Sequence, residues 1–271
     1  MKPAPFDYLR AEALAEAHDV LAAEGSDAAV IAGGQTLVPL LSTRMARPSV
    51  VLDIMHVGDL GGIRVAENAI RVGASVRQAE LLAWPELAAR QPLLAQALPW
   101  VGHAQTRARG TVCGSVALAD PSAELPLCLL ALGGHVALSS KAGQRRVAAE
   151  DFFTGLMSTA RRDDELIDSV SFPCARPDEG FAFREFARRH GDFAIVACAA
   201  VATEKSVRLA IGGVADRPIM REFDDANEDA LRDFADGLDA RDDLHATADY
   251  RRVLVRKIGA QTIAEAQACR V

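Results

Sequence analysis

Hydrophobic and polar positions alternate in short blocks along the first part of the chain. Residues 7–25 have the spacing of a helix, with Asp7 in the place of an N-cap and Gly25 in the place of a stop. The apolar segments AAVIAGG (28–34) and SVVLDI (49–54) have the length and composition of buried strands. The pattern therefore predicts a helix followed by a βα-type unit that begins at residue 28.

The next block mixes strands and helices. The alternation in IRVAENAIRVGAS (63–75) predicts a β-hairpin that turns near Glu67-Asn68. Helices are expected over VRQAELLAWPEL, LLAQALPWV and the apolar segment from residue 125, and a strand is expected over HVALSS. The segments EDFFTG and ELIDSVSFP, within residues 147–172, close this part of the chain.

Residues 181–215 have a different character. FAFREFA, AIVACAAVAT and VRLAIGGV predict three successive strands joined by the polar turns RRHGD and TEKS, which indicates an antiparallel sheet. Residues 224–268 are acidic and have a helical pattern, so helices should cover this sheet. The Pro-containing stretch CARPDEG (174–180) is the expected boundary between the two parts.

Length and charge narrow the class of protein. The chain has 271 residues, 50% of them hydrophobic, which is enough for a sizeable core. A net charge of −7 and scattered arginines argue against a binder of nucleic acid. The N-terminal segment carries Pro, Asp and Glu where a signal peptide needs apolar residues, and no apolar run reaches the ~18 residues of a membrane span. We expect a cytoplasmic protein.

The cysteines do not suggest a metal centre or a disulfide framework. Five widely spaced cysteines are an odd number, and most lie in apolar surroundings. There is no CxxC, and the six histidines form no HxxxH pattern, so no iron–sulfur cluster or zinc site is expected on this chain. Any metal chemistry should belong to a partner.

The first candidate for chemistry is the turn IAGGQTL, residues 31–37, between two hydrophobic segments. Glycine permits positive φ and close approach to the main chain, and successive amides in such a turn form a concavity that favours phosphate. The alternative is a tight strand-to-helix turn that binds nothing.

A second candidate is RGTVCGSVALADPSAELP, residues 109–126. Its many small residues on an irregular backbone suggest a ligand lying against the chain. The hydroxyls of Thr111 and Ser115 and the carboxylate of Glu124 suit phosphate oxygens and ribityl or ribose hydroxyls. The alternative is a closely packed loop and helix start.

Three segments together carry a family resemblance. AGGQTLVPLL, RGTVCGSVALADPSAELP and FREFARRHGDFAIVACAA resemble, in the same order and over essentially the whole chain, the FAD-binding medium subunit of molybdenum hydroxylases, the group of carbon monoxide dehydrogenase, quinoline oxidoreductase and xanthine dehydrogenase. The resemblance implies an α+β fold. It places a two-subdomain FAD-binding domain of the PCMH type over residues 1–175, with subdomains of about 1–57 and 58–175. A C-terminal domain like that of the carbon monoxide dehydrogenase flavoprotein, a three-stranded antiparallel sheet with a helical bundle, follows over residues 176–271.

The resemblance also assigns cofactor contacts, and it implies no catalytic side chain on this chain. It implies pyrophosphate contacts at Ala32, Gly33, Gly34, Gln35 and Thr36, flanked by Ile31 and Leu37; phosphate and ribityl contacts at Thr111, Gly114, Ser115 and Glu124; an adenine pocket at Val101 and Gly102; and positions near the flavin ring for Ile167, Arg184 and Asp192.

Two positions depart from the family pattern. Cys113 stands where glycine is common, and Arg184 stands where a relative has lysine; arginine neither deprotonates nor provides a compact point charge. Cys113 is interpreted as a small packing residue rather than a redox thiol.

The function implied is electron transfer through FAD. In the family, molybdopterin sits on a large subunit and two [2Fe–2S] clusters sit on a small subunit, so a heterotrimer or a dimer of heterotrimers is expected. This chain would take electrons from the clusters and pass them to an external acceptor. Two alternatives stay open, a stand-alone FAD-dependent oxidoreductase and a non-catalytic nucleotide-binding scaffold.

Overall fold

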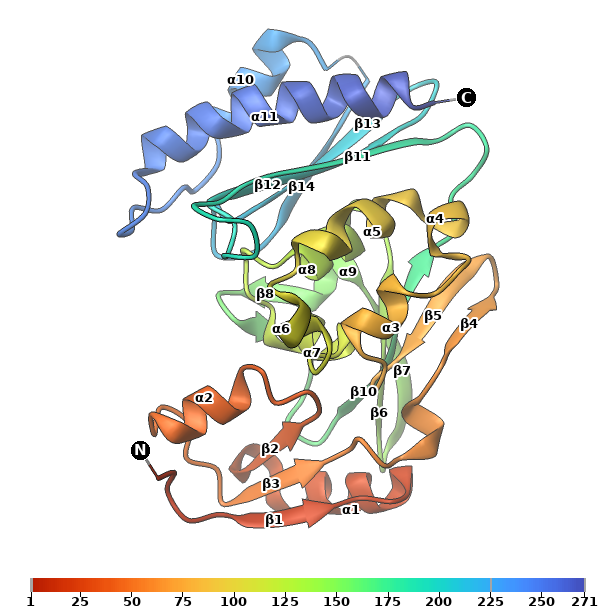
Figure 1. Ribbon diagram of the computed structural model, residues 1–271, viewed down its shortest axis with the longest axis vertical. Helices are drawn as coiled ribbons and strands as arrows, with labels where there is room; N and C mark the ends of the chain where they lie inside the picture. The colour runs from red at the N-terminus through yellow and green to blue at the C-terminus, as the bar shows by residue number, and fades with distance from the viewer. Residues whose placement is uncertain (1, 225, 271) are drawn as a thin grey trace.

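The computed structural model describes residues 2–224 and 226–270, and three tiers are stacked along its longest axis (Figure 1). The lowest tier is a parallel sheet in the order β1-β3-β2, with helices α1 and α2 beside it. Its elements are β1 (Asp7–Arg10), α1 (Leu14–Glu24), β2 (Ala28–Ile31), α2 (Leu37–Ser42) and β3 (Val50–Asp53).

The prediction that the first helix begins at Asp7 is wrong. Residues 7–10 form β1, whose Asp7 amide donates to the carbonyl of Ser49, and helix α1 begins only at Leu14. The stop at Gly25 is confirmed, with φ of +52° at the C-cap. Pairing with β3, about 40 residues away in sequence, overrides the local helical spacing.

The middle tier is built on an antiparallel sheet in the order β4-β5-β10-β6-β7. The hairpin predicted at Glu67-Asn68 is confirmed, since both residues have positive φ between β4 and β5. The strands are β4 (Ile63–Ala66), β5 (Ala69–Gly73), β6 (His135–Ser140), β7 (Gly143–Ala148) and β10 (Leu166–Pro173), with a small ribbon of β8 (Phe153–Gly155) and β9 (Ser158–Thr159).

Short helices cover this sheet. The single helix predicted over 76–87 is instead two, because α3 ends before Pro85. The backbone predicted to be irregular after Arg109 is helical over residues 112–118 and then turns at Ala119, which has φ of +52°. The helices are α3 (Gln78–Leu82), α4 (Leu87–Arg90), α5 (Pro92–Ala97), α6 (Ala104–Arg107), α7 (Val112–Leu118), α8 (Glu124–Ala131) and α9 (Ala149–Phe152).

The upper tier is an antiparallel sheet in the order β11-β12-β13-β14. Three strands were expected, and the fourth, β14, was missed because its segment IMREF is an exposed edge without a buried run. The elements are β11 (Gly180–Phe186), β12 (Val196–Ala202), β13 (Val207–Gly212), β14 (Ile219–Phe223), α10 (Glu228–Asp236) and α11 (Ala248–Ala268).

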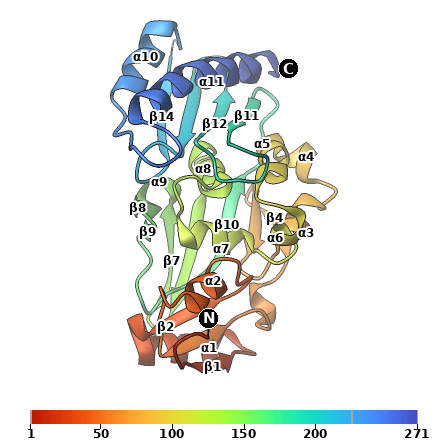
Figure 2. The same ribbon diagram turned by 60° about the vertical axis from the view of Figure 1, so that its left-hand side comes forward.

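Helices α10 and α11 cover the outer face of this sheet, and α5 and α8 lie against the inner face (Figures 1 and 2). The helical tail expected from residue 224 is confirmed as this pair of helices; Met1, Asp225 and Val271 lie outside the described residues. The α+β class is confirmed. In the described part of the chain, no helix has both the length and the apolar character needed to cross a membrane.

Candidate functional site

A single cavity of about 610 Å³ collects residues from all three tiers. Fifteen of the sixteen residues expected at the cofactor line it, and Arg184 is the exception. Those lining it are Ile31, Ala32, Gly33, Gly34, Gln35, Thr36, Leu37, Val101, Gly102, Thr111, Gly114, Ser115, Glu124, Ile167 and Asp192.

The turn between β2 and α2 forms one wall. Gly34 has φ of +71°, a conformation that favours glycine, and in the described part of the chain the amides of Gly34 and Gln35 donate to no protein acceptor. Gly33 lies so close to the second loop that a Cβ would sit 2.3 Å from the carbonyl oxygen of Arg109. The two loops singled out in the sequence therefore touch each other.

The second loop forms the opposite wall at the start of α7. Thr111 is the N-cap, and its hydroxyl oxygen accepts from the amide of Gly114 at 3.0 Å. The hydroxyl proton of Thr111 is left for another acceptor. Gln78 lines the cavity nearby and is 5% exposed, and its Oε1 has no partner among the described residues.

Glu124 is one of the acidic groups that line the cavity. It is the first residue of α8 and only 6% exposed, which places a carboxyl group in a dry wall. Burial, with a smaller contribution from the charge of Asp120, raises its pKa to about 7, against the lowering effects of a backbone hydrogen bond and of Arg107. The group is therefore poised between its charged and uncharged forms at neutral pH.

The far end of the cavity is formed by β10 and by the turn between β11 and β12. Leu166 and Ile167 supply apolar surface, and Gly191, Asp192 and Phe193 come from the turn. Figure 1 shows this turn reaching from the upper sheet toward α6. His190 holds it there by an edge-on contact with Trp100, with 4.8 Å between ring centroids.

Arg184 is not where the resemblance placed it. Its Nε donates to Oε2 of Glu265 on α11 at 2.8 Å, on the outer face of the upper sheet. Side chains alternate along a strand, so Arg184 points away from the face that carries Phe183 and Glu185. The expected contact with the flavin ring is corrected accordingly.

Sequence reasoning missed several residues of the wall. Leu166 adjoins the expected Ile167 and is found by extending that segment by one position, whereas Phe193 is the aromatic residue that the resemblance places after Asp192. Others stand in no motif and are brought in only by the fold: Gln78, Thr106, Arg161 and Glu165. Cys113 also lines the cavity; burial raises its pKa to about 12, so it is an inert thiol, as expected.

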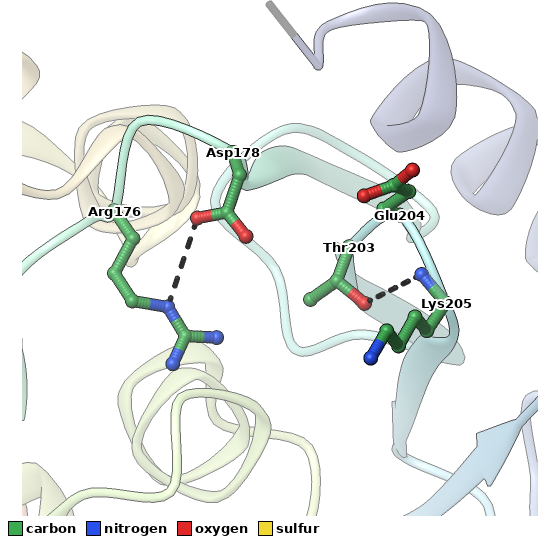
Figure 3. Close-up of a pocket in the computed structure, with 5 residues that line it drawn as sticks. All are labelled: Arg176, Asp178, Thr203, Glu204 and Lys205. Carbon is green, nitrogen blue, oxygen red and sulfur yellow. Dashed lines mark hydrogen bonds and ion pairs between the residues drawn. The ribbon is translucent and has the colours of Figure 1, made fainter.

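A second, smaller hollow lies between the linker at 176–178 and the turn at 203–205 (Figure 3). Two contacts lie within it: Arg176 faces Asp178 at 3.9 Å, and the backbone amide of Lys205 donates to the hydroxyl of Thr203. Nothing in it is buried and unpartnered. Across the described residues, no group of three or more His, Cys, Asp or Glu side chains is arranged to hold a metal ion.

Comparison with known proteins decides the family. Residues 4–175 match the model of the FAD-binding domain in molybdopterin dehydrogenase. The chain belongs to this family. It is a FAD-binding oxidoreductase subunit, as the sequence indicated.

Named members of the family are similar over nearly their whole length. The 6-hydroxypseudooxynicotine dehydrogenase complex subunit alpha of Paenarthrobacter nicotinovorans is 36% identical over 98% of this chain and 96% of its own. The caffeine dehydrogenase subunit beta of Pseudomonas sp. (strain CBB1) is 34% identical over 98% and 96%.

Solved structures agree with the family. A carbon monoxide dehydrogenase chain from Hydrogenophaga pseudoflava has a TM-score of 0.92 and 29% identity over 100% of both chains. A chain of quinoline 2-oxidoreductase from Pseudomonas putida 86 has a TM-score of 0.91 and 33% identity over 99% of each. The three-tier arrangement is therefore that of the family.

The cavity of this chain fits the family's cofactor. Its volume lies within the ~300–1,000 Å³ of small-molecule sites. It offers unused amide donors at Gly34 and Gln35, an unpartnered acceptor at Oε1 of Gln78 and a buried carboxyl at Glu124. Such a set suits a long ligand with phosphate, hydroxyl and ring portions.

Proposed function

We propose that this chain is the electron-transfer subunit of a molybdenum hydroxylase, taking electrons from [2Fe–2S] clusters of a partner subunit and passing them through FAD to an external acceptor. The observation that carries the proposal is the cavity shared by three segments. In it the turn at residues 31–37 and the loop at residues 109–126 both meet the β11–β12 turn. A site made by three separate tiers suits a dinucleotide better than a mononucleotide.

Each part of the cavity has a proposed role. The amides of Gly34 and Gln35 would hold the pyrophosphate, with hydroxyls from Thr111 and Ser115. Glu124 would bind ribityl hydroxyls, Val101 and Gly102 would enclose adenine, and Ile167 and Asp192 would lie at the ring. When bound, the flavin supplies one- and two-electron chemistry that no side chain of this protein offers.

The proposed partners are a large molybdopterin subunit and a small subunit with two [2Fe–2S] clusters, in a heterotrimer or a dimer of heterotrimers. Relatives named as subunits or medium chains support this assembly. The cytoplasmic location expected from the sequence stays a prediction.

The test is the identity of the released flavin and of the co-purifying chains. Denaturation of freshly purified protein should release FAD, and a tagged chain should bring down a molybdopterin subunit and an iron–sulfur subunit. Release of FMN alone would contradict the dinucleotide site. FAD without partner chains would favour the stand-alone oxidoreductase, and absence of any flavin would favour the scaffold.

A further inference from the structure

Glu185 has a buried carboxyl group without a hydrogen-bond partner in the described part of the chain. It lies on β11 between two exposed residues, Arg184 and Phe186, yet both of its carboxyl oxygens are inaccessible and have no hydrogen-bond partner among the described residues. A buried polar group without a partner is costly, so a structural role alone does not explain why a glutamate stands there.

The position of Glu185 points toward the FAD cavity. Along β11, Phe181 and Phe183 pack into the core shared with the middle tier, and Glu185 has the same parity. The inner face of this sheet is covered by α5 and α8 (Figure 1), and α8 begins with Glu124, which lines the cavity. Two buried carboxyl groups from different tiers thus lie behind one wall of the site.

Their charges are coupled. Burial and the negative charge of Glu124 raise the pKa of Glu185 to about 8, above the value of about 7 for Glu124. Burial and the charge of Glu124 therefore both favour the protonated form of Glu185 at neutral pH. The elements packed around the pair also carry Asp120 before α8, Cys128 on α8, Arg107 and the N-cap His103 on α6, and Arg188, Arg189, His190 and Asp192 in the β11–β12 turn. Helix α5 contributes the neutral Gln96.

We propose that Glu185 is a positioning residue for the cofactor, whose uncharged carboxyl spares Glu124 a second negative charge from β11 while FAD is bound. The inference rests on the proposed function. An ionised Glu185 would add a second charge beside Glu124, and among the described residues no cation pairs with the Glu185 carboxyl to offset it. Flavin should therefore be lost at alkaline pH.

The experiment measures the dissociation constant of FAD for the full chain from pH 6.5 to 9.5. Glu185→Gln is the test variant, and Glu204→Gln, at an exposed position in the turn between β12 and β13, is the control. Wild type and Glu204→Gln should bind progressively more weakly above about pH 8. Glu185→Gln, which mimics the protonated acid, should match wild type at pH 6.5 and bind at least about five-fold more tightly than wild type at pH 9, since each proton released contributes up to ten-fold per pH unit.

A second measurement does not use flavin. A carboxyl group that is protonated in the folded protein and ionised in the unfolded chain destabilises the fold as pH rises above the unfolded pKa of about 4.3. Glu185→Gln should therefore raise the thermal unfolding midpoint of the apoprotein at pH 8 by at least about 2 °C, and leave it unchanged at pH 4.

The outcomes separate this inference from the proposed function. A chain that binds no FAD at any pH overturns both. If the affinity for FAD depends on pH in the same way in wild type and in Glu185→Gln, the inference is overturned but the proposed function is not. If the variant does not fold, infrared spectroscopy of the wild-type protein replaces it. A band of a protonated carboxylic acid at pH 7.5 that disappears by pH 9.5 together with the flavin supports the inference. The absence of this band at pH 7.5 overturns it.

Discussion

Single residues set how closely the two cofactor loops approach. Gly33 has no unusual φ, but its Cα faces the backbone of Arg109 and Gly110 so closely that any side chain would overlap it. The neighbouring Gly34 is required for a different reason, its φ of +71°. One glycine thus permits contact between loops, and the other permits the turn itself.

Gly33→Ala should push the loops apart. Overpacking of this kind costs about 1–3 kcal/mol, so the thermal unfolding midpoint should fall by several degrees and FAD retention by at least about ten-fold. Gly58→Ala is the matched control, because a Cβ there meets nothing within 4 Å, and it should stay within about 0.5 kcal/mol of wild type. If Gly33→Ala keeps the thermal unfolding midpoint and the flavin content of wild type, the two loops can separate without cost and the prediction is wrong.

At the scale of elements, one ion pair fastens β7 to the segment that leads into β10. Arg145 donates from Nε and Nη2 to the two oxygens of Glu165 at 2.6 and 2.8 Å, and the side chain of Glu165 is 5% exposed. The hydrogen bonds from Arg145 lower the pKa of Glu165 against the effect of burial. Glu165 also lines the cavity beside Leu166, so the pair supports the ring end of the site.

Arg145→Met should leave a buried carboxylate without its partner. We expect a loss of about 2 kcal/mol at pH 7, reduced because Arg145 is partly exposed. A lowered pKa in the folded state contributes stability above the unfolded pKa and loses it as pH falls, so the difference between variant and wild type should shrink by pH 4.

Urea unfolding at the two pH values measures this effect. Arg146→Met is the control, because Arg146 lies on the same strand but pairs with Glu67 in solvent and should change stability by less than about 0.5 kcal/mol. Adding Glu165→Gln to Arg145→Met should recover part of the loss. If Arg145→Met and Arg146→Met lower the stability equally at pH 7, the burial of Glu165 does not strengthen its ion pair.

At the scale of the whole molecule, the cavity reaches the surface at the turn between β11 and β12. Phe193 is 66% exposed there, and Arg188 and Arg189 are exposed beside it. A flavin that takes electrons from another subunit needs its donor within a short tunnelling distance. The turn is therefore our candidate for the docking face, with the two arginines opposite acidic groups of the partner.

Reversal of both charges, Arg188→Glu with Arg189→Glu, should leave flavin content normal and weaken assembly with the molybdenum and iron–sulfur subunits by at least about ten-fold at low salt. The same double reversal at Arg232 and Arg256, on the outer helices α10 and α11, is the control. Normal assembly and normal flavin reduction by substrate in the first variant would place the docking face elsewhere.

The sequence alone determined most local structure and the chemistry of the site. Period-two alternation and turn residues located the hairpin at Glu67-Asn68 and three strands of the upper sheet, because these patterns report local backbone geometry and burial. The two loops were identified by composition, and the resemblance then supplied residues that line one cavity, Arg184 excepted.

Which partners these segments meet depends on long-range packing. Local spacing placed residues 7–10 in a helix, whereas pairing with β3 makes them a strand. No pattern in the sequence shows that Gly33 abuts Arg109, that Gln78 and Glu165 enter the cavity, or that Arg184 pairs with Glu265 while its neighbour Glu185 is buried near Glu124. The periodicity of a chain specifies which face of an element is buried, but the group that covers that face comes from distant sequence and is fixed only when the tiers pack.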